Sequence, residues 1–346
     1  MCLTMARFAL IMFSCLFAFF GLTTQAQSLP SKEEATSLLH RAFQEITLQD
    51  AGTPPYHLVA RVHIEMEEAF RDGMYEVLWA SPNRFRENFK IEGLAETDVV
   101  LGDKLHIFRT SPLVMFPFDA VRQFLSSPIP TRLTTRPEAK RISFDEIHGE
   151  RDTCIYTHED VYVSASVERV CFSTSTNEVV LIEAIPRDSS DSFLLRLEDF
   201  AGVGTKRYPR HLHQEKFGEV LDVKVDAINE AKFGDSVFVP PPGSELRDWC
   251  PVPILQKTAK QVISFRFPKA SRFPAYYILI GVDGRAKNAQ LLWEPDKKLK
   301  QQFNLWLQET KFPIRMCGDR AVEYDTVVSS NGASPMFVSG PSAASK

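Results

Sequence analysis

Short segments in which apolar and polar residues alternate follow one another through most of the chain, and they constrain its fold more than any other feature. In residues 56–68, YHLVARVHIEMEE, the positions of one face hold Leu58, Ala60, Val62 and Ile64. Similar segments meet at tight turn signals such as Gly102-Asp103. A period of two indicates strands with one buried face, and short connections join antiparallel strands. The pattern therefore predicts a large antiparallel sheet.

Three segments instead carry apolar residues at helical spacing. Ser31 and Glu34 form a capping box at the start of the first, over about residues 31–48. The others lie at 118–125 and 296–310. Because an amphipathic helix must bury its apolar face, the predicted class is α+β, with a curved antiparallel sheet or half-barrel packed on helices.

Prolines and charge divide the chain into two units. The run Pro240-Pro241-Pro242-Gly243 reads as a linker. Residues 27–249 hold 25 Lys and Arg against 37 Asp and Glu, a net charge of −12, whereas residues 250–346 hold 14 against 7, a net charge of +7. We expect an antiparallel β domain over 27–243, a second domain over 244–330 and a disordered tail over 331–346, and the opposite charges favour attraction between the two domains.

The N-terminus has the pattern of a secretory signal peptide. Arg7 precedes an apolar run over residues 8–22, and Thr24 and Ala26 follow at cleavage spacing. We expect residues 1–26 to be removed and the mature chain to act in the periplasm. The alternative is that residues 8–22 anchor the protein in the inner membrane, although that run is short for a spanning helix.

Four cysteines remain after the predicted cleavage, and an even number in an exported chain favours disulfides. Cys154 and Cys171 lie in neighbouring predicted strands at a separation that brings opposed positions within reach. We therefore predict this pair, and with it Cys250–Cys317. The alternative is four reduced, buried thiols.

Motifs for catalysis or cofactor binding are absent from the sequence, so we predict a protein that is not an enzyme and holds no metal or cofactor. No H-E-x-x-H or G-x-S-x-G is present. His211 and His213 face one side of a predicted strand, but the sequence does not identify a third metal ligand. Asp98 and the pair Glu67-Glu68 are expected as solvated charges in strand ends and loops. Nucleic acid is not an expected partner in this compartment.

Residues 31–243 resemble the LolA/LolB-like, outer-membrane lipoprotein-sorting-like, half-barrel class. The shared features are the N-terminal amphipathic helix, the antiparallel run that includes SPNRFRENFKIEG, a Tyr208-Pro209 step and a closing aromatic–Val–Pro strand. The resemblance implies a curved sheet over helices whose concave side holds a lipid or acyl chain.

Residues 262–328 resemble the C-terminal domain of TonB-type proteins. The shared features are a strand, Asp283-Gly284 leading into the next strand, a helix carrying Leu299, Phe303 and Trp306, then Phe312-Pro313 and a final strand. The resemblance implies a small ββαβ domain that contacts an envelope or outer-membrane protein. A globular domain stands where TonB proteins have a Pro-rich spacer, which argues against force transduction.

These features predict a periplasmic protein that docks a partner protein through its C-terminal domain; the alternative is a carrier of a lipid or acyl chain. The strand 320–328 is the candidate docking edge, with Val327 as a backbone donor and with charged residues along it, Arg320, Glu323 and Asp325. Charge on an edge strand also prevents aggregation, and this protective role is the competing interpretation.

Overall fold

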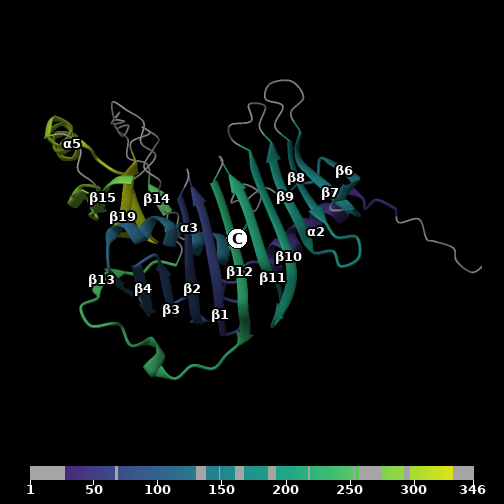
Figure 1. The fold of residues 1–346 in the computed structure, drawn as a ribbon, viewed down its shortest axis with the longest axis horizontal. Helices are drawn as coiled ribbons and strands as arrows, with labels where there is room; N and C mark the ends of the chain where they lie inside the picture. The colour runs from purple at the N-terminus through teal and green to yellow at the C-terminus, as the bar shows by residue number, and fades with distance from the viewer. Residues whose placement is uncertain are drawn as a thin grey trace, which may run out of the picture.

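One sheet of thirteen antiparallel strands dominates the computed structural model of this chain (Figure 1). The structure describes residues 28–66, 69–129, 138–147, 149–159, 167–185, 192–216, 219–251, 254–256, 274–291 and 297–329. The strands of the large sheet are β1 (Tyr56–Met66), β2 (Ala69–Ser81), β3 (Arg84–Ile91), β4 (Leu94–Leu101), β5 (Lys104–Arg109), β6 (Arg141–Ile147), β7 (Glu150–Glu159), β8 (Val167–Phe172), β9 (Val179–Ile185), β10 (Phe193–Val203), β11 (Lys206–Lys216), β12 (Glu219–Glu230) and β13 (Glu245–Asp248).

Two meanders joined side by side make this sheet. Strands β1 to β5 follow in order toward one edge, strands β12 to β6 follow in order toward the other, and β1 pairs with β12 between them. Strand β13 pairs with β5 and so forms the last strand at that edge of the sheet. The large sheet therefore takes in Glu245–Asp248, which lies beyond the predicted boundary at Gly243. The predicted antiparallel sheet is confirmed, and the described part of the protein is mostly β.

Helices α2 (Lys32–Glu45) and α3 (Met115–Ser126) lie on one side of the sheet, which we call the inner face (Figure 1). A 3-10 turn, η1 (Pro112–Val114), leads into α3, and another, η3 (Asp235–Phe238), follows β12. The core between sheet and helices holds large side chains that are at most 1% exposed, among them Tyr56, Phe89, Phe118, Phe172 and Tyr208. The opposite side of the sheet is the outer face.

Helix α2 starts as the sequence predicts. The backbone N–H of Ser31 donates to Glu34 Oε2 at 2.8 Å, and the N–H of Glu34 donates to Ser31 Oγ at 3.2 Å. These bonds satisfy backbone donors that have no partner within the helix. The capping box is therefore confirmed.

Two small sheets and one helix form the C-terminal part: β14 (Ile254–Gln256), β17 (Ile314–Cys317) and β18 (Arg320–Val322) in one, and β16 (Ala286–Leu291), β15 (Pro274–Ile280) and β19 (Tyr324–Ser329) in the other, with α5 (Lys297–Glu309). In chain order these elements are β15, β16, α5, β17, β18 and β19, so two strands of the other small sheet come between the helix and the last strand, and the predicted ββαβ order is not found as such. The β15–β16 hairpin turns at Gly284, whose φ is +76° and where a Cβ would lie 2.5 Å from a backbone oxygen of Phe312.

The strand predicted over residues 320–328 is two strands in different sheets, which corrects the sequence prediction. A turn at Gly318, with φ of +59°, folds β18 back on β17. The chain then leaves that sheet at Glu323, and β19 pairs with β15.

Among the described residues no helix combines the length and the apolar composition that crossing a membrane requires. The predicted signal peptide, residues 1–26, and the predicted tail, residues 331–346, lie outside the described residues.

Candidate functional site at the junction of the large sheet and the C-terminal strands

Strand β19, which contains most of the predicted docking edge, has a strand on one side only among the described residues. In the sheet order β16-β15-β19, β15 is central and Tyr277 lies opposite Val327. An edge strand presents unpaired backbone groups with which an extended segment can pair. The described part of β19 thus has the backbone geometry for strand addition.

The sequence led us to expect Asp325 of β19 on a solvent-exposed edge. Its side chain instead faces the large sheet. Its Oδ2 lies 3.3 Å from Arg109 Nη2, and its Oδ1 accepts a hydrogen bond of 2.7 Å from Tyr277 Oη. Arg247 Nη2 is 3.6 Å from the same Oδ1. The carboxylate is only 12% exposed. Two arginines of the large sheet therefore decide where Asp325 points.

The other two charged residues of the predicted edge also make ion pairs with the large sheet. Glu323 Oε2 lies 3.7 Å from Arg247 Nη1. Arg320 Nη1 lies 3.5 Å from Asp248 and 3.8 Å from Asp103. These three side chains thus hold the C-terminal strands against β5, β13 and the β4–β5 turn, while Val327 contributes its backbone to β19.

Arg109 links Asp325 to a second, deeper carboxylate. Its Nη2 is 3.1 Å from Glu96 Oε1 as well as 3.3 Å from Asp325. Burial alone would lower the pKa of Arg109, but the charges of Glu96 and Asp325 outweigh it, so the pKa is raised and the guanidinium stays charged.

Three carboxylic acids lie on the inner face among core side chains. Glu87 is 0% exposed, and Glu96 and Asp98 are 2% exposed. Glu87 on β3 lies directly opposite Asp98 on β4. Asp98 is therefore buried in the middle of a strand, and the expectation of a solvated charge was wrong.

A sequence signal for these acids existed. Glu87 lies between Phe85 and Phe89 in the alternation of β3, and Glu96 and Asp98 share the parity of Val100 in β4. Residues of one parity face one side of a sheet. An acid at an inward position indicates a buried polar site, although its partners come from elsewhere in the chain.

Arg122 of α3 supplies the main positive charge for this cluster. Its Nε lies 2.6 Å from Glu87 Oε2, it contacts Asp98, and its Nη1 lies 3.5 Å from Asp119. Tyr75 Oη donates a hydrogen bond of 2.7 Å to Glu87 Oε1. Buried charges are stable only when paired and hydrogen-bonded in this way.

Two acids of the cluster have raised pKa values. Burial, with the nearby Asp98, raises the pKa of Glu96 well above its ordinary value. Burial also raises the pKa of Asp119 to about 6, although Arg122 acts in the opposite direction. Glu96 Oε2 and Asp98 Oδ1 are buried without a hydrogen-bond partner in the structure. The site thus favours a proton on some of its carboxyl groups.

A cavity of about 130 Å³ lies within this charged junction, lined by residues that include Glu96, Asp98, Asp119, Arg315 and Asp325. A dry cavity of about 150 Å³ holds one benzene molecule. A space of this size and polarity suits water molecules or a small polar group, and it is too small and too charged for a lipid chain.

Two cysteine pairs have disulfide geometry, and they are the pairs that the spacing predicts: Cys154–Cys171 and Cys250–Cys317, with S–S distances of 2.02 and 2.21 Å. The second joins Cys250, two residues after the end of β13, to Cys317 at the end of β17, so it ties the junction covalently. Two such pairs are consistent with an oxidising, extracytoplasmic location.

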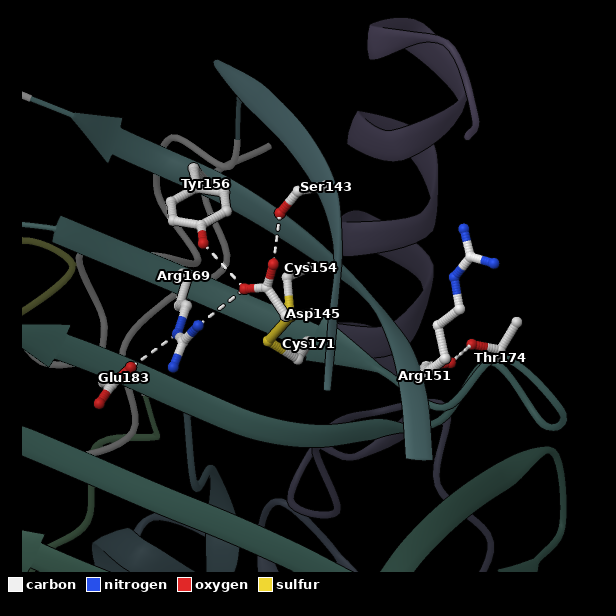
Figure 2. The surroundings of a disulfide bond; sticks show 9 residues. All are labelled: Ser143, Asp145, Arg151, Cys154, Tyr156, Arg169, Cys171, Thr174 and Glu183. Carbon is white, nitrogen blue, oxygen red and sulfur yellow. Dashed lines mark hydrogen bonds and ion pairs between the residues drawn. A yellow bond between two sulfur atoms is a disulfide. The ribbon is translucent and has the colours of Figure 1, made fainter. Parts of the chain in front are cut away.

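The Cys154–Cys171 pair lies beside a half-buried ion cluster (Figure 2). Asp145 accepts hydrogen bonds from Ser143 Oγ at 2.7 Å, Tyr156 Oη at 2.9 Å and Arg169 Nη1 at 2.7 Å. Burial would raise the pKa of Asp145, but these hydrogen bonds and the charge of Arg169 lower it overall. Asp145 and the two sulfur atoms lie within 4.8 Å of one another, but sulfurs joined to each other are not thiolate ligands for a metal.

Comparison with known proteins gives remote structural similarities. No family model and no curated protein matches the chain. A LolA superfamily protein from Nitrosomonas europaea is 16% identical, covering 59% of this chain and 97% of its own, with a TM-score of 0.36. A DUF1329 family protein from Desulfovibrio piger is 9% identical over 61% and 98% of the two chains, with a TM-score of 0.37.

The MucA/MucB complex of Pseudomonas aeruginosa is similar over more of the chain, 89% of this one and 95% of the other, at 10% identity and a TM-score of 0.28. These similarities include the LolA superfamily, to which the sequence of residues 31–243 bears a resemblance. The comparisons do not support the TonB-type resemblance of residues 262–328.

Proposed function

We propose that this protein is a non-enzymatic protein of the cell envelope that docks a partner protein by strand addition at the edge of β19 that faces away from β15. The observation that carries the proposal is the position of β19, which pairs with β15 alone among the described residues. Peptide segments add to such edges through backbone hydrogen bonds, with side chains choosing the partner.

The placement of charge supports docking over the protective interpretation. An edge that avoids aggregation presents charged side chains to solvent. The sole charged residue of β19 is Asp325, and its carboxylate forms ion pairs with Arg109 and Arg247. The remainder of the strand, Thr326 to Ser329, is uncharged and rich in β-branched residues, which favour pairing.

The expected partner is an extended acidic segment of another envelope protein. Residues 250–346 carry a net charge of +7, so an acidic segment is attracted to this region. MucB appears with MucA in the similar structures, but the proposal rests on the edge and the charge of this chain.

The alternative of a lipid or acyl-chain carrier requires an apolar space between sheet and helices. There the core side chains of Leu39, Phe89, Phe118 and Tyr208 are 0% exposed. The cavity described above has a volume of only about 130 Å³, and acids and arginines lie in its lining beside apolar side chains such as Phe85 and Ile107. These observations favour docking.

Site-specific photocrosslinking in the native envelope tests the proposal. A photoreactive residue in place of Val328, near the end of β19, should crosslink to one defined partner whose modified peptide is extended and acidic. A probe in place of Leu305, 59% exposed on α5, is the control. Equal crosslinking from both positions, or none from Val328, would contradict docking at β19.

Proline substitution gives a second, independent test. Successive residues of a strand direct their N–H groups to opposite sides. Of Val327→Pro and Val328→Pro, one should therefore break the ladder to β15 and lower thermal stability, and the other should leave the fold intact and lose the crosslink. If the variant that stays folded still captures the partner, strand addition is wrong.

A further inference from the structure

Side chains of the outer face line a hollow of about 790 Å³, formed by β1, β2, β12 and the β3–β4 hairpin. Binding sites for small organic molecules commonly have volumes of about 300–1,000 Å³. The charged cavity at the junction is far smaller, at about 130 Å³. The hollow on the outer face is therefore the one of these two spaces that can hold an organic ligand.

Four of the lining side chains form a single row across the strands. Lys224 of β12 lies opposite Arg61 of β1. Arg61 lies opposite Met74 of β2, and Met74 lies opposite Lys90 of β3. Directly opposed residues point to the same side of a sheet, and this is the outer side because Val223, next to Lys224, is 0% exposed in the core. Neighbouring strands lie about 4.8 Å apart, so the two lysines are roughly 14 Å apart along the row.

The lysines at the two ends of the row have no acidic partner. Lys90 and Lys224 are exposed, and no carboxylate oxygen of a described residue lies within 4.0 Å of either ammonium group. Arg61 between them differs, because its Nη2 is 2.7 Å from Asp226. A lysine ammonium is a compact point charge that attracts carboxylate and phosphate groups. The two ends of the row are therefore the places where an anionic group gains most.

The acids that also line the hollow lie outside this row and already have partners. Asp72 is 2.7 Å from His63 Nδ1, and Glu92 is 3.7 Å from Arg71 Nε. Two imidazole nitrogens of β11 lie 2.9 and 3.1 Å from Asp222 Oδ2. Asp72 and Asp222 are two positions along their strands from the row, a displacement of roughly 6.6 Å. A ligand that follows the row thus places its anionic groups on the lysines and away from these carboxylates.

Met74 gives the middle of the row an apolar surface. Its side chain is 42% exposed, although it is large and hydrophobic. The flexible, polarizable thioether of methionine adapts to different apolar groups and is frequent at binding surfaces. We propose that the hollow binds an elongated amphiphile whose apolar middle lies on Met74 and whose two anionic ends pair with Lys90 and Lys224.

Dodecanedioate is a suitable probe, because its two carboxylates are separated by an alkyl chain of nearly the length of the row. Isothermal titration calorimetry of the mature, disulfide-intact protein at pH 7.5 should show saturable binding of one molecule per chain. Hexanedioate is half as long, and dodecanoate has a single carboxylate, so each reaches one lysine only. Both should bind about fivefold more weakly, which is the most that one exposed ion pair supplies.

Substitutions of the exposed lysines test the site without disturbing the core. Lys90→Gln and Lys224→Gln should each weaken dodecanedioate binding about fivefold. Lys232→Gln is the matched control, because Lys232 is an exposed lysine after β12 that does not line the hollow. It should bind as the wild type does. In protein with ¹³C-labelled methionine methyl groups, the resonance of Met74 should shift on binding and that of Met115 in α3 should not.

The proposal is wrong if dodecanedioate shows no saturable binding, or if hexanedioate binds as tightly. Equal losses in Lys232→Gln and in the two variants of the row would contradict it, as would an unchanged Met74 resonance at saturation. An oligoglutamate peptide that binds through Lys90 and Lys224 where dodecanedioate does not would show that the hollow takes a protein segment, and would equally overturn the proposal. None of these outcomes bears on docking at β19, which uses other residues.

Discussion

Arg109 on β5 and Asp325 on β19 lie 3.3 Å apart although 216 positions separate them in the sequence. The overall charges of the two parts, negative in the large sheet and positive in the C-terminal part, favour attraction. This buried pair has the opposite polarity, with the base on the sheet and the acid on the C-terminal strand. It therefore supplies a specific contact that the net charges do not predict.

Asp325→Asn should lower the free energy of unfolding by about 3 kcal/mol, because it removes a buried partner of Arg109 and Arg247. The exposed pair Arg61–Asp226, at 2.7 Å on the outer face, is the control, and Asp226→Asn should cost less than about 1 kcal/mol. Urea titrations of both variants measure the difference. Equal costs would contradict the importance of the junction.

Asp119 gives the junction a defined pH dependence. Its folded pKa of about 6 exceeds the ordinary value of 3.8, so the folded state holds the proton more tightly than the unfolded state. This contribution is fully present below the unfolded pKa and is lost as pH rises through the folded pKa. The group therefore lowers stability as pH rises from about 4 to about 6.

Asp119→Asn, which mimics the protonated acid, should for this reason gain about 2 kcal/mol relative to the wild type between pH 4 and pH 7. Denaturation curves of both proteins at several pH values measure the gain. A difference that is constant over this range would show that Asp119 keeps an ordinary pKa.

The two cysteine pairs should contribute unequally to stability. In the chain-entropy model, Cys250–Cys317 with a separation of 67 residues is worth about 4 kcal/mol, and Cys154–Cys171 with a separation of 17 is worth about 3 kcal/mol. Double alanine variants of each pair, unfolded without reductant, test the order. Peptide mapping that joins Cys154 to Cys250 or Cys317 would refute the pairing itself.

The N-terminus offers a direct test of export. Cleavage after Ala26 should give a mature chain that begins at Gln27. Intact-mass measurement of protein from its own envelope shows the start point. A membrane-extracted chain that retains residues 1–26 would instead support the anchor.

The strands, the helices and the hairpins at Gly102-Asp103 and Asp283-Gly284 follow from local patterns that the sequence displays. The position of β13 did not, because a four-residue strand after a proline run has too few residues for alternation to identify it. The split of 320–328 depends on Glu323, where the chain changes sheets, and no local propensity marks such a change.

The candidate site was less predictable than the fold. The parity of Glu87 between Phe85 and Phe89 is visible in the sequence, but its significance depends on Arg122, which arrives from a helix that follows β5. Asp325 likewise reads as a surface charge until Arg109 is placed beside it. Pairing across such separations depends on the tertiary fold, so single-sequence reasoning finds one partner at best.

The pairing of β1 with β12 has a kinetic consequence. The central strand β1 pairs with β12, which lies far along the chain, so the topology contains many long-range contacts. Topologies of this kind fold slowly. During that interval the apolar residues of β1 and its unpaired backbone are exposed to other chains. Until β12 is available and pairs with β1, a newly made molecule is therefore more prone to aggregation than the folded protein.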